Sequence, residues 1–455
     1  MRCERFNFSF VHGVSSAFSL QEIRNDEARL FLMNHIIREK EKVNQITLIP
    51  PQRLHATIGL PSSKSISNRV LVIHALSHSA YEVANVSDCD DTRVMLKALG
   101  EDAPVVDIMA AGTAMRFLTA YYAATEGCVK TMTGTERMQH RPIRILVDAL
   151  RQLGARITYV KDEGYPPLLV EGCPLEEKEV ALQGSVSSQY ISALLMIGPM
   201  MKHGLTLRLE GEVISRPYIN LTLRLMRDFG AEADWVSEHE IRVSPVRYAP
   251  IPFTVESDWS AASYWYEIVA LSEDAEAEVV LPGLFAESYQ GDSAVARMFE
   301  ALGVSTCYDE EHHRVTLRKN GLRAERMEYD FVDQPDLAQT FVVTCAMLGV
   351  PFRFTGLQSL KIKETDRMAA LMCEMKKLGY LLREEEGCVL EWRGERCEPE
   401  ADVAIDTYED HRMAMAFAPA CMAMGEVRIN HPGVVSKSYP HYWEDLEKAG
   451  FRIRH

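Results

Sequence analysis

The sequence lacks several features that would assign it to common protein classes. Its ten cysteines are scattered and form no C-x-x-C pair, which argues against a disulfide scaffold and a zinc ribbon and suits a reducing cytoplasm. The most apolar stretch, residues 191–201, is far shorter than the roughly 20 residues that span a bilayer. We therefore expect a cytoplasmic protein that does not associate with membranes.

Two nucleotide-binding motifs are also missing. No G-x-G-x-x-G pattern follows a predicted strand, so a dinucleotide-binding fold is not supported. Lys64 and Ser65 resemble the end of a phosphate-binding P-loop, but Ser63 and Ile58 stand where that motif requires glycine.

Length and charge narrow the remaining classes. A chain of 455 residues predicts two or more domains, and 47% hydrophobic with 25% charged residues is an ordinary globular mixture. The net charge of −16 repels nucleic acids and anionic membranes, which disfavours a non-specific binder of either. A local basic pocket remains compatible with this composition.

Residues 1–45 form an N-terminal extension to which we assign no function. They include a run of alternating charges, residues 38–42, and contain no apolar core of a signal peptide. Their acidic residues disfavour an organelle transit peptide. The extension is either partly helical or lies upstream of the true translation start.

An internal repeat organises the rest of the chain. An amphipathic helical pattern that ends in glycine and continues into an extended segment occurs six times. We expect each glycine to end its helix in the left-handed conformation. The six are Gly100, Gly154, Gly230, Gly303, Gly379 and Gly450.

A second pattern alternates with the first. Six times a small polar cluster opens a helix that is apolar nearly all round, as a buried helix would be. The clusters begin at Ser62, Ala111, Ser185, Asp258, Gln334 and Asp410. Segments such as 240–244 and 314–318 predict strands between the helices. We infer six α+β units, three per domain, whose converging helix N-termini would bind anions. Alternatively, the Ser and Asp residues are simply N-caps.

Basic residues favour the anion site. They stand in the clusters or just before exposed helices, where the helix dipole disfavours a cation unless an anionic ligand compensates. They are Lys64, Arg69, Arg116, Arg137, Arg141, Lys363, Arg367, Arg412 and Lys437. Asp336 and Glu364 lie among them and are candidates for proton transfer. A glutamate in the position of Glu364 is usually a first-turn helix acid or a salt-bridge partner, and that alternative stays open.

Histidines offer weaker candidates. Asp410 and His411 could be metal ligands or a catalytic dyad, but a helix cap and a packed histidine are the simpler interpretation. His74 and His78 have the i, i+4 spacing of zinc ligands without a third ligand nearby, which argues against zinc.

From about residue 46 onward the chain resembles the 5-enolpyruvylshikimate-3-phosphate synthases of the enolpyruvyl transferase family. The resemblance is carried, in order, by LPSSKSISNR (60–69), AGTAMR (111–116), RMQHRP (137–142), SVSSQ (185–189), SRPY (215–218), PD (335–336), KETDR (363–367), DHRM (410–413) and Lys437. It implies an α+β and α/β fold of two similar domains, each with three β-α-β-α-β-β units, like an inside-out α/β barrel. One domain would comprise residues 63–257, and the other residues 46–62 and 258–455.

The resemblance also implies the reaction. The enolpyruvyl group of phosphoenolpyruvate would move to the 5-hydroxyl of shikimate 3-phosphate, releasing phosphate, in aromatic amino acid biosynthesis. No metal or organic cofactor is implied, and the family is commonly monomeric.

The same resemblance implies roles for individual residues. Shikimate 3-phosphate would contact Ser65, Arg69, Ser187, Ser188, Gln189, Ser215, Asp336 and Lys363. Phosphoenolpyruvate would contact Lys64, Gly112, Arg141, Gln189, Arg367, Arg412 and Lys437. Asp336 would accept the hydroxyl proton, Glu364 would protonate the methylene carbon, and Lys64 would assist the leaving phosphate. His411 is a minor candidate.

The chain departs from the family pattern beside Gly112. Met109 and Ala110 replace the usual Gly-Asn pair, Phe117 replaces a common proline, and Ser359 maps near a usual asparagine. We expect bulk near the cavity wall to alter phosphoenolpyruvate affinity and to reduce sensitivity to the herbicide glyphosate.

Two alternatives remain open. A UDP-N-acetylglucosamine enolpyruvyl transferase would share the fold, but it would lack the motif at residues 64–69 and commonly has a reactive cysteine in a mobile loop. A non-catalytic anion-binding protein on the same scaffold would have no use for Asp336 and Glu364.

Overall fold

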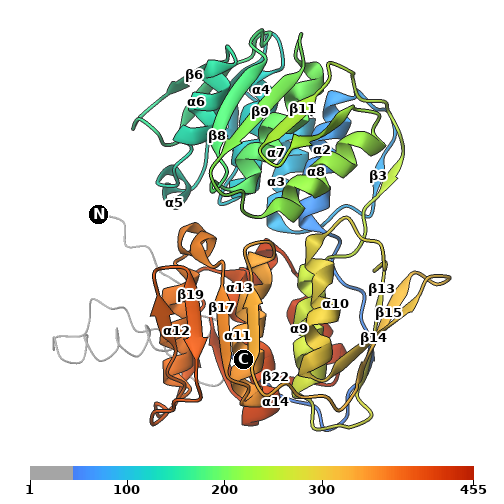
Figure 1. The fold of residues 1–455 in the computed structure, drawn as a ribbon, viewed down its shortest axis with the longest axis vertical. Coiled ribbons are helices and arrows are strands. Elements are labelled where there is room, and N and C mark those ends of the chain that lie inside the picture. Colours follow the sequence, from blue (N-terminus) through green and yellow to red (C-terminus); the bar gives the residue numbers. More distant parts are fainter. Residues whose placement is uncertain (1–44) are drawn as a thin grey trace, which may run out of the picture.

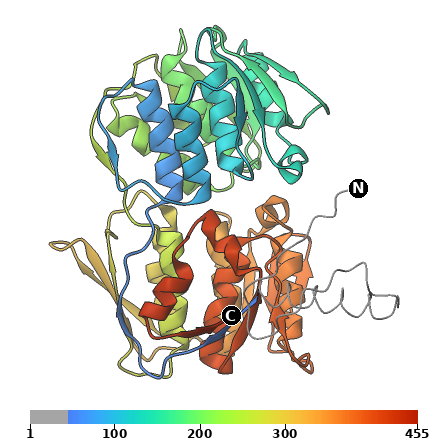
Figure 2. The ribbon, with the colours of Figure 1, turned by 180° about the vertical axis from the view of Figure 1, so that it is seen from behind.

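The computed structural model describes residues 45–455, apart from the side chain of Ile362, so the N-terminal extension assigned above lies outside the described residues. The chain forms two lobes stacked along the long axis (Figures 1 and 2). Each lobe has its own hydrophobic core. One core draws its buried residues from Ile66 to Val255, and we call this part the first lobe. The second lobe has a core drawn from Ile46 to Leu60 and from Trp259 to Phe451.

The first lobe contains three sheets. Two are four-stranded, with orders β4-β5-β7-β6 and β10-β11-β9-β8, and the third pairs β3 with β12. Their bounds are β3 Val83–Ala84, β4 Val105–Asp107, β5 Val129–Thr133, β6 Arg156–Tyr159, β7 Leu168–Glu171, β8 Glu179–Gln183, β9 Leu205–Glu210, β10 Ala233–Ser237, β11 Glu240–Val243 and β12 Phe253–Thr254.

The second lobe contains three four-stranded sheets, with orders β20-β21-β1-β22, β14-β15-β13-β2 and β16-β17-β19-β18. Their bounds are β1 Gln45–Ile49, β2 His55–Thr57, β13 Glu278–Pro282, β14 Val304–Asp309, β15 Arg314–Lys319, β16 Met327–Asp330, β17 Phe352–Thr355, β18 Arg383–Glu385, β19 Val389–Trp392, β20 Ala404–Ile405, β21 Val427–Asn430 and β22 Arg452–Arg454. The strands predicted near 240 and 314 are confirmed as β11 and β15.

Each four-stranded sheet contains one parallel pair, which requires a crossover connection. In four sheets a buried helix forms this crossover connection. The connected pairs are β4 and β5, β8 and β9, β16 and β17, and β20 and β21. The other two parallel pairs, β2 with β13 and β3 with β12, join strands that are far apart in the sequence. They arise where the chain passes from one lobe to the other.

The helices fall into the two predicted kinds. Six are buried nearly all round: α2 Lys64–Leu76, α4 Gly112–Ala123, α7 Ser188–Ile197, α9 Trp259–Leu271, α11 Ala338–Leu348 and α13 His411–Phe417. Six bury one face: α3 Asp90–Gly100, α6 Arg144–Gln152, α8 Arg216–Asp228, α10 Val295–Met298, α12 Arg367–Lys377 and α15 Tyr442–Lys448. Short helices α5 Glu136–Gln139 and α14 Cys421–Met424 complete the set. Among residues 45–455 no helix is both long and apolar enough to cross a membrane.

Five of the six repeat glycines adopt the expected positive φ, but the prediction for Gly100 is wrong. Gly100 is the last residue of α3, and Glu101 continues directly in an extended conformation, with φ −114° and ψ 133°. No left-handed residue is needed there, because the chain leaves the helix without reversing.

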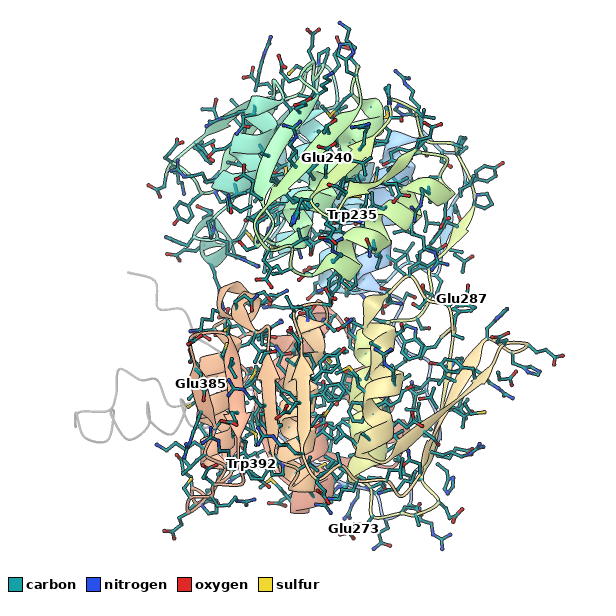
Figure 3. All side chains as sticks on the ribbon, in the orientation of Figure 1. Trp235, Glu240, Glu273, Glu287, Glu385 and Trp392 are labelled. Carbon is teal, nitrogen blue, oxygen red and sulfur yellow. The ribbon has the colours of Figure 1, made fainter. Side chains whose placement is uncertain are left out.

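The two chain crossings between the lobes lie side by side. Ser62 and Ser257 form an antiparallel bridge. The Ser63 amide donates to the Glu256 carbonyl at 2.9 Å, and the Asp258 amide donates to the Pro61 carbonyl at 2.9 Å. Both crossings therefore end at the start of a buried helix, α2 and α9. Figure 3 shows Trp235 and Glu240 in the first lobe, Glu385 and Trp392 in the second, and Glu287 near the level where the lobes meet.

Candidate active site

A cavity of about 940 Å³ is lined by residues of both lobes. Members of all six predicted polar clusters border it, including Lys64, Gly112, Ser187, Asp258 and Asp336. His411 and Arg412 represent the sixth cluster. The prediction that the cluster-bearing helices begin at one common region is therefore confirmed.

Several cluster residues are also N-caps, as the simpler interpretation proposed. Asp258 accepts from the Ser260 amide at 2.8 Å, and Asp410 accepts from the Arg412 amide at 2.9 Å. Ser63 and Ser187 cap α2 and α7 in the same way. Both interpretations therefore hold: these residues cap their helices, and the helices begin at one common cavity. The cavity also contains polar groups that are not caps.

All nine basic residues singled out above line this cavity, namely Lys64, Arg69, Arg116, Arg137, Arg141, Lys363, Arg367, Arg412 and Lys437. They come from both lobes. The carboxylates of Asp336 and Glu364 line it as well. The prediction that these cations share one crevice with Asp336 and Glu364 is therefore confirmed, while the roles of the individual residues stay predictions.

Arg367 connects the carboxylates of the second lobe. It begins α12, and its side chain is 2% exposed. Its guanidinium donates to Asp410 Oδ2 at 2.7 Å, Asp336 Oδ1 at 3.1 Å and Glu364 Oε2 at 2.8 Å. Three acidic groups thus hold one cation, so most donors of Arg367 are already occupied before any ligand binds.

Asp336 lies where cations of three elements meet. Besides Arg367, its Oδ2 accepts from Arg412 Nη2 at 3.0 Å, and Lys363 Nζ lies 3.5 Å from Oδ1. Burial alone would raise the pKa of this carboxyl, but Arg412, Lys363 and Arg367 outweigh it and hold the pKa well below its usual range. Asp336 is therefore ionised at neutral pH.

Glu364 is in a comparable environment. Burial favours its neutral form, yet the nearby charges of Arg367 and of Arg141 and Lys64 from the first lobe depress its pKa well below the usual range. The free enzyme therefore carries Glu364 as a carboxylate. To act as an acid, this group must first gain a proton.

Lys64 is the first residue of α2 and is largely buried. Burial lowers the pKa of its ammonium group, but the carboxylates of Asp91, 3.7 Å away, and Glu364 overcome this and raise it. Lys64 consequently remains a cation within the cavity. Asp91, which also lines the cavity, was missed by the sequence analysis because it belongs to no recognised motif.

Gly112 permits two arginines to approach the start of α4. A Cβ atom at this position would lie 2.7 Å from Arg141 Nη1 and 2.9 Å from Arg116 Nη1. Arg116 Nη1 also donates to Gln189 Oε1 at 2.7 Å. Burial and the charge of Arg116 lower the pKa of Arg141. Two adjacent guanidinium groups with few acidic partners form a site suited to an anion.

Arg69 differs from the other cations, because its partners are neutral groups of its own lobe. It donates to Thr222 Oγ1 at 2.7 Å, the Ser65 carbonyl at 2.8 Å and Ser192 Oγ at 3.2 Å, and it lies 5.3 Å from the ring centre of Phe117. Burial lowers its pKa to about 10. Arg69 thus braces α2 against α7 and α8 while also bordering the cavity.

The remaining predicted residues also line the cavity. Ser65, Ser187, Ser188, Gln189 and Ser215 do so on the first lobe. Ser215 has a left-handed backbone, with φ 55°, and its amide donates across the lobes to the Val332 carbonyl at 3.0 Å. Tyr218, three residues later, lines the cavity too, although no separate role for it was predicted from the sequence.

Two polar side chains lining the cavity have unused hydrogen-bonding capacity. Neither ring nitrogen of His411, which is 2% exposed, has a hydrogen-bond partner among the described residues, and neither does Ser359 Oγ. Burial and the charges of Lys64 and Arg412 hold the pKa of His411 well below its usual range, so the ring is neutral. Within residues 45–455 no group of three or more His, Cys, Asp or Glu side chains is arranged to hold a metal ion.

The prediction that Met109 and Phe117 add bulk to the cavity wall near Gly112 is wrong. Met109 is 53% exposed, and Phe117 is fully buried in the first-lobe core; neither lines the cavity. Of the four positions that depart from the family pattern, Ala110 and Ser359 border the cavity. The expected change in glyphosate sensitivity stays a prediction, but direct crowding by Met109 or Phe117 is not its cause.

Comparisons with known proteins agree with this geometry. The family model of EPSP synthase (3-phosphoshikimate 1-carboxyvinyltransferase) matches residues 48–103 and 100–446. A 3-phosphoshikimate 1-carboxyvinyltransferase of Bacteroides fragilis is 63% identical over 407 residues, covering 90% of this chain and 98% of the relative. One from Sulfurovum sp. is 35% identical over 436 residues, covering 89% and 99%.

Solved structures share the fold. The EPSP synthase of Acinetobacter baumannii superposes with a TM-score of 0.72 at 20% identity, covering 90% of this chain and 100% of that one. The enolpyruvyl transferase NikO of Streptomyces tendae gives 0.68 at 15% identity, covering 90% and 98%. With the family match over nearly all described residues, these findings show that the chain belongs to the EPSP synthase (3-phosphoshikimate 1-carboxyvinyltransferase) family.

Proposed function

We propose that the cavity between the lobes holds shikimate 3-phosphate and phosphoenolpyruvate side by side and that the residues lining it carry out the family's reaction. That reaction transfers the enolpyruvyl group of phosphoenolpyruvate to shikimate 3-phosphate in aromatic biosynthesis. The observation that carries the proposal is the gathering of nine cations from both lobes around Asp336 and Glu364 in one cavity. Both substrates and their adduct are polyanions, which such a set of cations would bind.

On this proposal shikimate 3-phosphate occupies the side formed by α2, α7 and α8. Ser65, Ser187, Ser188, Gln189 and Ser215 offer hydroxyl, amide and backbone groups there. Arg69 supports this wall through its contacts with Thr222 and Ser192. Asp336 and Lys363 complete the site from the second lobe.

Phosphoenolpyruvate would bind between the two lobes. Arg141 and Gly112 lie on one side with Gln189, and Arg412 and Lys437 lie on the other. Lys64 lies between these groups and remains protonated. Arg367 would act mainly by holding Asp336 and Glu364 in position, because its donors are occupied by carboxylates.

The chemistry would require proton transfers in both the addition and the elimination step. The substrate hydroxyl adds to C2 of phosphoenolpyruvate as Asp336 takes its proton and Glu364 supplies a proton to C3, which becomes a methyl group. The tetrahedral adduct then loses phosphate, which leaves with a proton from Lys64, and C3 returns a proton to Glu364, which restores the double bond. Lys64 would regain its proton from Asp336, so the hydroxyl proton leaves with the phosphate and every group returns to its starting state. Fixed cations would stabilise the adduct without reorganising, and shared binding would remove much of the entropic cost of encounter.

The ionised state of Glu364 in the free enzyme agrees with this scheme if ligand anions restore its proton. Phosphate and carboxylate groups near Arg141 and Lys64 would offset the cations that depress its pKa. Asp336 would likewise become more basic as Lys363 and Arg412 turn toward substrate.

We also propose that the lobes are two domains, residues 63–257 and residues 46–62 with 258–455, built from six related β-α-β-α-β-β units. The separate cores and the six sheets support this division. The paired crossings at Ser62 and Ser257 would serve as the hinge. Each domain supplies part of the cationic set, so closure would assemble the site. We expect a monomer.

The direct test is phosphate release from phosphoenolpyruvate with alternative acceptors. The proposal expects release with shikimate 3-phosphate and none with a UDP-sugar. Release with only the UDP-sugar would favour the other enolpyruvyl transferase activity. No release with either, despite binding of shikimate 3-phosphate, would favour the non-catalytic anion binder.

A further inference from the structure

The two lobes are also joined at one edge of the cavity by a small polar contact. Ser436 Oγ of the second lobe donates to Asp90 Oδ2 of the first at 2.6 Å. His441 Nε2 lies 3.1 Å from Asp88 Oδ2. The contact joins the start of α3 to the segment that runs from the short helix η7 (Pro432–Lys437) into α15.

Each side of this contact continues directly into the cavity. Asp91, which follows Asp90, pairs with Lys64 at 3.7 Å. Lys437, which follows Ser436, lines the cavity and donates from Nζ to the Glu409 carbonyl at 2.8 Å. The contact therefore fixes the distance between two elements that each position an ammonium group at the substrate site.

We propose that Asp88, Asp90, Ser436 and His441 form an interlobe latch that positions Lys437 at the cavity, and that proton loss from His441 loosens it. The inference rests on the proposed function, because Lys437 is assigned there to phosphoenolpyruvate. Ser436 and His441 are positioning residues in this scheme, since neither lines the cavity that would hold the substrates.

The imidazole of His441 lies between two carboxylates. Nδ1 is 3.0 Å from Glu444 Oε2 on its own helix, and Nε2 faces Asp88 from the other lobe. Among the described residues, Glu444 and Asp88 are the charged groups that act on the ring. Asp90, two residues after Asp88, accepts from Ser436 instead. Both nitrogens can donate at once only when the ring is an imidazolium.

Loss of the proton converts one of these hydrogen bonds into a contact between two acceptors. Glu444 first, and then Asp88, raise the pKa of His441 above its usual range, despite some opposing desolvation. The ring is therefore charged below its usual pKa, and its favourable contribution disappears as pH rises through the raised value. Because both partners are partly exposed, we expect an effect of at most about fivefold.

The test compares wild type with His441→Lys, which keeps a cation at alkaline pH, and His441→Gln, which never carries one. We expect the wild-type kcat/KM for phosphoenolpyruvate, divided by that of His441→Lys, to fall about three- to fivefold between pH 6 and 8.5. The wild-type kcat/KM for phosphoenolpyruvate divided by that of His441→Gln should be above one at pH 6 and should approach one at pH 8.5. Ratios that stay constant with pH overturn the latch.

Glu444→Gln is the matched control, since it removes the carboxylate that does not reach the other lobe. It should keep the pH-dependent fall but move its midpoint to lower pH, whereas Asp88→Asn should abolish the fall. If no variant, nor wild type, releases phosphate, the proposed function fails instead. The latch is then judged by X-ray scattering: the radius of gyration should rise with pH for wild type but not for His441→Lys, and equal values overturn it.

Discussion

The guanidinium of Arg367 lies against the carboxylate of Glu364, with Nη2 2.8 Å from Oε2. The same guanidinium binds Asp336 and Asp410, so the two proposed proton-transfer groups share one buried cation. This arrangement fixes both carboxylates in place and also depresses the pKa of each. On the proposed scheme, Glu364 therefore needs anionic ligands nearby before it can hold a proton.

Replacing Glu364 with glutamine should separate binding from turnover. The amide keeps the shape and can still accept from Arg367, but it cannot exchange the proton with C3. We expect turnover to fall by about 10²–10⁴-fold, with shikimate 3-phosphate affinity changed little, measured by phosphate release and calorimetry. The control is Glu384→Gln, which removes the partner of Lys361 outside the cavity. Turnover near wild type for Glu364→Gln would refute its role.

Ligand binding should be accompanied by proton uptake. The pKa of Glu364 lies well below its usual range in the free protein, because Arg367, Arg141 and Lys64 favour the carboxylate over the opposing effect of burial. Shikimate 3-phosphate with inorganic phosphate should offset these charges and raise that pKa. Calorimetry near pH 6, in buffers that differ in ionisation enthalpy, should detect uptake that is reduced in Glu364→Gln. Equal uptake in both proteins would contradict this explanation.

Asp292 should make stability depend on pH. It is buried, and Tyr218 of the other lobe donates to it at 3.1 Å. Burial, together with the charge of Asp336, raises its pKa to about 6. Because the folded-state pKa is raised, the stability that protonated Asp292 contributes is fully present below about pH 4 and is lost as pH rises through about 6. Asp292→Asn should therefore change the free energy of unfolding more favourably at pH 7.5 than at pH 4.5, by on the order of 1–3 kcal/mol.

Urea unfolding at both pH values measures this difference. Asp274→Asn provides a contrast of opposite sign, because the backbone amides of Leu54 and Glu276 lower the pKa of Asp274. Removing that carboxylate should destabilise the protein at neutral pH more than in acid. A gain for Asp292→Asn that is the same at both pH values would show that its titration is not the cause.

Met109 carries backbone strain beside the cavity. Its φ is 51°, in the left-handed region that disfavours a side chain, and the side chain itself is half exposed. Met109→Gly should therefore stabilise the protein by about 1 kcal/mol. Ala110 has no positive φ, so Ala110→Gly should instead cost roughly 0.5–1 kcal/mol. Thermal unfolding that ranks the two variants in the reverse order would disprove the strain.

Periodicity and polarity predicted much of this fold for physical reasons. Buried helices such as α7 are apolar on all sides, and exposed helices such as α12 end at a left-handed glycine, so both kinds were recognisable. The cationic residues were recognisable because basic side chains at helix starts are electrostatically unfavourable without an anion. The family resemblance then supplied the reaction.

Long-range pairing could not be predicted in the same way. The parallel pairs β2 with β13 and β3 with β12 depend on where the chain crosses between lobes, which local patterns do not encode. The same holds for Arg367, whose three carboxylate partners come from separate segments. Met109 lies in the turn before α4, and Phe117 packs into the first-lobe core. Neither placement follows from local sequence patterns, and this is why the expected crowding of the cavity wall was wrong.

The most direct test of the central claim is a crystal structure of Glu364→Gln grown with shikimate 3-phosphate and phosphoenolpyruvate. The account predicts both molecules in the interlobe cavity, with Lys64, Arg141, Arg412 and Lys437 within about 4 Å of the phosphate or carboxylate oxygens of phosphoenolpyruvate. Phosphoenolpyruvate bound outside this cavity, or bound within it without contacts from both lobes, would contradict the account.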